Sequence, residues 1–165
     1  MTVNYWSEFF QIDQSELKAR VVASVNPLKN TLALATDEKP DLYGPFWLST
    51  SCVFMLLISD SFWNVLVNML RQKDSRNVFN FQQIGFATSL VYGAFGLFPL
   101  IFFISNKLLG SGASVVKCAC IYGYGNLAFV AASLLSVFPV TALRVIFWLL
   151  ALLHSVLFLI SNLKK

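Results

Sequence analysis

Polar side chains inside an apolar stretch are the residues of this chain that could carry chemistry. Asp60, Asn64 and Asn68 recur every four residues, so on a helix they form one polar stripe. A carboxylate in such a stretch is costly unless it faces protein or water. With a helix rise of about 1.5 Å per residue, Arg144 of a later apolar run lies at a similar depth, and we predict that it pairs with Asp60. The alternatives are a protonated, hydrogen-bonded Asp60 and an ion or proton site.

Other reactive side chains form no recognisable constellation. His154 is the only histidine, and its apolar run holds no carboxylate or thiol that could share a metal ion with it. Cys52, Cys118 and Cys120 lie in apolar runs, where a thiol is usually a small buried hydrophobe; lipid attachment at Cys118 or Cys120 is the alternative. No Ser-His-Asp arrangement or glycine-rich phosphate loop is present. We therefore expect no enzyme activity, no cofactor and no metal.

Long apolar runs must position these residues. The chain is 57% hydrophobic and 12% charged, whereas soluble domains are about 45–50% apolar and about 25% charged. A membrane-spanning helix needs about 20 apolar residues, and helices are the spanning form that suits such runs. We predict an all-α membrane protein, a four-helix transmembrane bundle with spans at about 46–70, 84–105, 113–137 and 142–161.

A polar head precedes the bundle and divides the chain into residues 1–44 and 45–163. Asp13 and Glu16 have capping-box spacing and predict a helix that starts near Gln14 and ends at Asn26-Pro27. Its apolar residues recur at helical spacing. We expect this amphipathic helix to lie on the membrane surface or to dock against the bundle.

The charge distribution predicts orientation. The net charge is +4, but the basic residues are scattered, so nucleic acid is not an expected partner. Lysine and arginine near the run ends favour a cytosolic N-terminus. An even number of spans would place the C-terminus on the same side.

The start of the first run carries the most specific motif, Asp41-Leu42-Tyr43-Gly44-Pro45-Phe46-Trp47. Gly44 suits a helix N-cap and Pro45 suits the first turn. Asp41 would lie near the positive end of the helix dipole. The aromatic rings of Tyr43, Phe46 and Trp47 suit the headgroup level of a bilayer. On physical grounds alone, this motif could simply build a stable start for a membrane helix.

The third run carries a second motif, Tyr122-Gly123-Tyr124-Gly125. Ala119 and Gly123 have the spacing at which small residues let membrane helices approach closely. We predict that Gly93 and Gly96 of the second run face them and that these residues together form a helix-packing seam. A ligand or lipid groove is the alternative.

The two motifs together resemble the signature of the Yip family, the Rab-interacting multi-pass membrane proteins of the early secretory pathway. The resemblance implies a Golgi or ER–Golgi membrane protein of vesicle-mediated transport that binds prenylated Rab GTPases and sibling Yip proteins. Asp41 to Trp47 would be the partner-binding residues.

The sequence departs from the family pattern in several places. The family has five spans, whereas this sequence offers four, so we expect the chain to oligomerise or to pair with a sibling. Lys117 stands where related sequences tend to carry an acid, Asp60 where they carry a small residue, and Ala131 near a usual proline.

Two other functions fit the same residues. One is a small ion-coupled channel or transporter built around Asp60. The other is a membrane-shaping protein that uses its head as a wedge.

Overall fold

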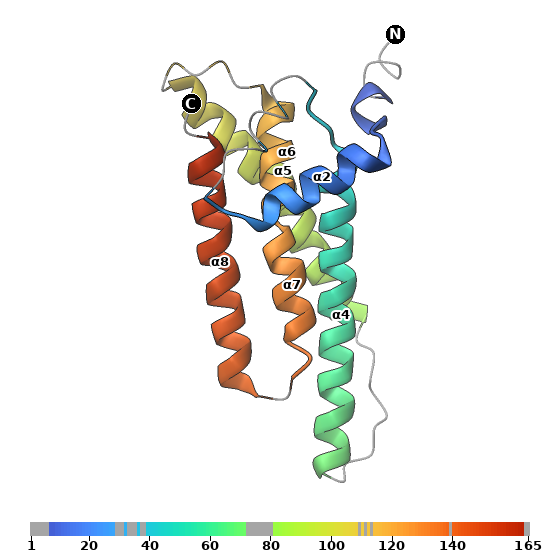
Figure 1. Cartoon of the computed structure of the whole chain (residues 1–165). Helices are drawn as coiled ribbons and strands as arrows, with labels where there is room; N and C mark the ends of the chain where they lie inside the picture. Colours follow the sequence, from blue (N-terminus) through green and yellow to red (C-terminus); the bar gives the residue numbers. More distant parts are fainter. Residues whose placement is uncertain are drawn as a thin grey trace.

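The computed structural model describes residues 7–28, 32, 36, 39–71, 81–108, 110, 112, 114–138 and 140–163. Within these residues every element is a helix, in the order η1 (Glu8–Phe10), α2 (Gln14–Val25), α4 (Tyr43–Arg71), α5 (Phe81–Leu108), α6 (Val115–Gly125), α7 (Leu127–Leu135) and α8 (Thr141–Leu163) (Figure 1). The predicted all-α fold is confirmed. Residues 1–6, the connection 72–80 between α4 and α5, and Lys164-Lys165 lie outside the described part.

Four of the described helical stretches are long and apolar enough to cross a membrane: α4, α5, α6 with α7, and α8. They agree with the four predicted spans. The third span is divided at Asn126, whose N–H bonds to the Gly123 carbonyl at 3.1 Å. This i to i−3 bond tightens the turn, and the glycines that precede it are weak helix formers.

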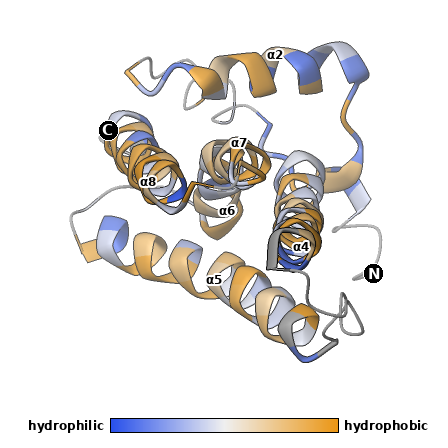
Figure 2. Cartoon of the chain, turned by 90° about the horizontal axis from the view of Figure 1, so that it is seen from below, coloured by the Kyte–Doolittle hydropathy of each residue, from blue (hydrophilic) through white to orange (hydrophobic). Residues whose placement is uncertain are grey.

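The divided span forms the centre of the bundle. Figure 2 shows α6 and α7 in the middle, α4 and α8 on either side of them, and α5 opposite α2. In Figure 1, α2 crosses the bundle at a steep angle to α4 and α8. The third span therefore touches every other long helix and also the head.

The main buried cluster lies where the head meets the bundle. Leu32, Cys120, Ile121, Tyr124 and Phe158 are fully buried there, and partly buried side chains pack around them: Leu17, Val21, Leu48 and Leu159. The head and the spans therefore share one core. Elsewhere many large apolar side chains remain exposed, as expected of helices that face lipid.

Helix α2 begins and ends where the sequence predicts. Asp13 is its N-cap residue and accepts a hydrogen bond from the Ser15 hydroxyl. Glu16 does not complete a capping box with Asp13 but pairs with Arg20 one turn further along. Leu17 and Val21 of α2 pack on the core, while Val22 stays exposed. Of the two predicted positions of this helix, the structure shows the docked one.

The predicted Asp60–Arg144 pair is wrong: no ion pair joins them in the described part of the chain. Asp60 accepts a hydrogen bond from Asn64 at 3.1 Å, so two residues of the polar stripe are linked, and Asn68 lies one turn further along with intermediate exposure. The guanidinium of Arg144 lies 4.9 Å from the ring centroid of Trp63, a cation–π arrangement. Helix α7 packs between α4 and α8, so equal depth does not bring the two charges face to face.

The predicted packing role of Gly93 and Gly96 is also wrong. A Cβ atom added at either glycine would meet no other atom within 4 Å. The prediction failed because it did not account for the rotation of α6 about its axis. Gly123 faces α4, and the ring of Tyr122 is the group that contacts α5.

Candidate functional site

The first motif forms the start of α4. The helix begins at Tyr43, so Gly44 lies in the first turn and is not the N-cap residue that the sequence suggested. A carboxylate oxygen of Asp41 accepts the Gly44 N–H at 3.0 Å. Asp41 thereby satisfies a backbone donor that the helix itself leaves unpaired, and it lies at the positive end of the helix dipole.

Asp41 is the centre of a buried polar group that we call the Asp41 cluster: Asp41, Arg20, Tyr124, Cys120 and the Gly44 N–H. Arg20 Nη1 donates to Asp41 Oδ1. The Tyr124 hydroxyl lies 3.1 Å from Oδ2, and the Cys120 thiol lies 3.4 Å from Oδ1. Asp41 is 3% exposed and Arg20 is 2% exposed. Donors from the head, the first span and the third span thus converge on one carboxylate.

The second nitrogen of Arg20 anchors the same cluster to the chain around it. Arg20 Nη2 donates to the Lys39 carbonyl at 2.7 Å and to the carboxylate of Glu16. Burial alone would lower the pKa of Arg20, but the neighbouring charges of Asp41 and Glu16 outweigh burial and raise that pKa above its usual value. The guanidinium therefore stays charged. A buried ion pair needs such additional hydrogen bonds to offset its desolvation.

The second motif fits against the first. A Cβ atom at Gly123 would lie 2.2 Å from Cβ of Pro45 and 2.7 Å from its Cα. A Cβ atom at Gly44 would lie 2.3 Å from the Tyr124 hydroxyl oxygen. Each motif therefore contains a glycine that makes room for a side chain of the other. The two segments are far apart in sequence, yet they pack so closely that a side chain at Gly44 or Gly123 would collide with the other motif.

Neighbouring residues of the second motif contact different partners. Tyr122 stacks on Phe98 of α5, with ring centroids 5.6 Å apart. A Cβ atom at Gly125 would lie 3.3 Å from the ring of Phe158 on α8. Because Gly123 and Tyr124 face the start of α4, one turn of α6 connects α4, α5 and α8.

The first motif also has an outer side. Phe46 and Trp47 are 41% and 51% exposed, and their rings meet edge to face at 5.8 Å between centroids. Tyr43 is partly exposed and lies 6.2 Å from Trp47 between ring centroids. We call Tyr43, Phe46 and Trp47 the aromatic edge. The Leu42 N–H donates to the Phe9 carbonyl at 2.8 Å, which ties η1 to the start of α4.

Sequence reasoning missed two members of the Asp41 cluster, Arg20 and Cys120. One signal was present for Arg20: an acid directly before a membrane span needs a partner, and Arg20 is a basic residue of the preceding helix. No pattern in the sequence distinguishes Cys120 from the other two cysteines.

The Asp41 cluster can hold the head, the first span and the third span together. Both oxygens of Asp41 already accept internal donors. Among the described residues no group of three or more His, Cys, Asp or Glu side chains could hold a metal ion. The arrangement therefore suits a structural junction that presents the aromatic edge.

The fold and this junction define a multi-pass α-helical membrane protein whose head is fixed to its first and third spans. The Yip1 domain model matches residues 23–165, so the chain belongs to the Yip1 domain family. The family inferred from the two motifs is thereby confirmed.

Several curated proteins are similar to this chain. A protein described as a YIPF1 homolog from Dictyostelium discoideum is 32% identical over 161 residues, which cover 97% of this chain and 45% of that protein. Protein YIP5 of Schizosaccharomyces pombe is 25% identical over 166 residues, which cover 93% of this chain and 64% of the relative. Protein YIP5 of Saccharomyces cerevisiae is 26% identical over 147 residues, covering 78% and 45%. The chain thus spans about half to two thirds of the length of these relatives. No solved structure matches it.

Proposed function

We propose that this protein is a Golgi or ER–Golgi membrane protein that binds prenylated Rab GTPases and sibling Yip proteins in vesicle-mediated transport, and that it acts by binding and not by catalysis. The observation that supports this most is the division of the first motif. Its buried residues lock the head to the bundle, and its aromatic edge stays exposed. The class of partner is the one that the resemblance to the Yip family implies, and membership of the Yip1 domain family supports that choice.

The aromatic edge suits a partner that approaches along the membrane. Phe46 and Trp47 begin the first span and so lie close to where that helix leaves the bilayer. Exposed aromatic side chains in a fixed position are frequent anchors of protein interfaces. A single lipid chain gives only marginal membrane binding, so a prenylated GTPase gains from a second contact at the membrane surface.

The orientation of the chain follows from the same proposal. A GTPase of the cytosol can meet the aromatic edge only if the head side of the bundle is cytosolic. The lysine and arginine distribution favours this arrangement.

A pull-down with matched prenylated and unprenylated Rab proteins tests the proposal. The prenylated form should be recovered, and Trp47→Ala should lower the affinity by roughly tenfold or more, because a hot-spot aromatic at an interface contributes about 2 kcal/mol or more. Phe62→Ala is the matched control, since Phe62 is an exposed aromatic of the same helix beyond the edge. Equal recovery of both Rab forms, or equal effects of the two variants, would contradict the proposal.

A further inference from the structure

A cavity with a volume of about 210 Å³ lies inside the bundle, where α4, α5 and α8 surround the middle of the third span. Three of its lining residues carry groups that can form hydrogen bonds: Cys52 has a thiol, Tyr122 a hydroxyl and Asn126 an amide. Most of the other lining residues are aliphatic. Because Tyr122 and Asn126 are one helical turn apart, the cavity has one polar side in a mostly apolar wall.

The side chain of Asn126 has no hydrogen-bond partner among the described residues. Asn126 is 7% exposed, and as the N-cap residue of α7 it forms no side-chain capping bond. Its amide nevertheless keeps accessible surface, unlike unpaired atoms that are completely enclosed, such as Ser49 Oγ. A buried polar group without a partner is uncommon, and this one can be reached from the cavity.

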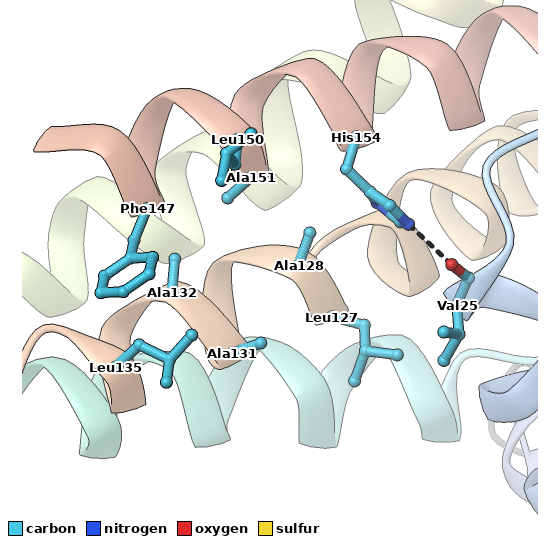
Figure 3. Close-up of a pocket in the computed structure, with 10 residues that line it drawn as sticks. All are labelled: Val25, Leu127, Ala128, Ala131, Ala132, Leu135, Phe147, Leu150, Ala151 and His154. Carbon is cyan, nitrogen blue, oxygen red and sulfur yellow. Dashed lines mark hydrogen bonds between the residues drawn. The ribbon is translucent and has the colours of Figure 1, made fainter. Parts of the chain in front are cut away.

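The groove between α7 and α8 in Figure 3 shows the difference. Its polar residue is His154, whose Nε2 lies 3.1 Å from the Val25 carbonyl oxygen and whose Nδ1 is completely enclosed. A molecule in that groove would therefore find no side-chain donor or acceptor, whereas a molecule in the cavity beside Asn126 would find an amide.

Asn126 lies near the middle of the membrane. The third span runs from Val115 to Leu135, so at about 1.5 Å per residue Asn126 is roughly 16 Å from one end and roughly 14 Å from the other. Lipid headgroups stay near the ends of such a span, because the hydrocarbon layer between them is about 30 Å thick. The lipid groups that reach the depth of Asn126 are hydrocarbon chains, which can neither donate nor accept a hydrogen bond.

We propose that this cavity binds a small cluster of water molecules, which pair with the amide of Asn126 and the hydroxyl of Tyr122. The Tyr122 hydroxyl also lacks a partner within the part of the chain that the structure describes. A buried water molecule needs about 10–15 Å³ of space and two to four polar partners, and the cavity provides both. Water can donate to the amide oxygen and accept from the amide nitrogen, so it suits both halves of the Asn126 side chain.

The division of the third span is a second reason for water at this place. The N–H of Asn126 bonds to the carbonyl of Gly123, three residues back, so the carbonyl of Tyr122, four residues back, does not receive it. Ordered water is one of the means by which a membrane helix compensates for such an interruption. The water cluster would thus stabilise the divided span at the centre of the bundle.

X-ray radiolytic footprinting of the full chain in lipid nanodiscs tests the proposal, because the hydroxyl radicals form from water and oxidise the side chains beside it. Two matched pairs of residues in the unaltered chain provide the comparison. Cys52 and Tyr122 line the cavity, whereas Cys118 and Tyr124 are completely buried elsewhere. Cys52 should be oxidised clearly more than Cys118, and Tyr122 clearly more than Tyr124.

Two variants test where the water binds. Asn126→Leu keeps the size of the side chain but removes the amide, so oxidation of Cys52 should fall by about fivefold or more, the factor that matches the loss of one hydrogen bond. Ala94→Phe should fill the cavity from α5 and lower the oxidation of Cys52 while the amide stays intact. Leu97→Phe, on the exposed surface of α5, is the control and should leave it unchanged.

Three results would overturn the proposal. One is oxidation of Cys52 and Tyr122 no greater than that of Cys118 and Tyr124, which would show that the cavity is dry. The others are unchanged oxidation of Cys52 in a folded Asn126→Leu variant or in a folded Ala94→Phe variant. The comparison within the unaltered chain needs no substitution, so it decides the matter even where a variant does not fold.

Discussion

Asp41 shows how much of this molecule depends on single residues. It accepts from the head through Arg20, from its own helix through the Gly44 N–H, and from the third span through Tyr124 and Cys120. Burying a lone carboxylate would be very costly. The four donors make the same residue an attachment point for three segments.

The two glycines of the junction act through the space that they leave free. Gly123 lies against Pro45, and Gly44 lies against Tyr124. Neither has a positive φ, so backbone conformation does not require glycine there. What requires glycine is the close approach of the two motifs.

Substitution of Gly123 tests this close approach. Gly123→Ala should destabilise the protein by at least about 1–3 kcal/mol, the usual cost of overpacking, because the new Cβ atom would collide with backbone as well as side-chain atoms of Pro45. Gly93→Ala is the matched control and should be neutral or stabilising by up to about 1 kcal/mol, since its Cβ atom meets open space. Thermal melts in detergent measure both. Equal shifts for the two variants would show that the motifs do not touch.

At the scale of the elements, the sequence predicts what depends on local pattern. Each long apolar run became a helix within a few residues of its expected ends, because a membrane helix satisfies its own backbone hydrogen bonds. The ends of helix α2 were also predictable from local signals, because Asp13 suits an N-cap and Asn26-Pro27 ends a helix.

What the sequence could not predict depends on which helices are neighbours and how each is rotated. Depth along a helix placed Asp60 near Arg144, but it said nothing of α7 between their helices. Spacing identified Gly93 and Gly96 as small residues, but it did not give the direction in which Gly123 faces. Arg20 and Asp41 are 21 positions apart, and no periodicity links them.

At the scale of the whole molecule, four spans and a docked head place η1 and the C-terminal end of α8 toward the same end of the bundle (Figure 1). We predict that tags attached at the two ends of this chain are both removed by protease from sealed microsomes, because the charge distribution favours a cytosolic head. Detergent-treated microsomes provide the control for tag accessibility. Protection of one tag alone would mean that one of the four helical stretches does not cross the membrane.

The Asp41 cluster joins the head to the first and third spans, so we expect the head and the bundle to move as one rigid body. Leu17 and Val21 add apolar contact between α2 and the bundle core, but the buried ion pair fixes the position of α2. If that pair is lost, the surface that presents the aromatic edge should loosen as well.

The most direct test is a double-mutant cycle on Arg20 and Asp41, measured as midpoints of thermal unfolding in mild detergent. Arg20→Ala and Asp41→Ala should each cost about 3–5 kcal/mol, because each leaves the other charge buried without its partner. The double variant should cost clearly less than the sum, with a coupling of about 1–3 kcal/mol. Lys18→Ala, on the exposed side of α2, is the control and should change little. Additive losses, or single losses no larger than that of the control, would contradict the claim that this pair holds the head to the membrane bundle.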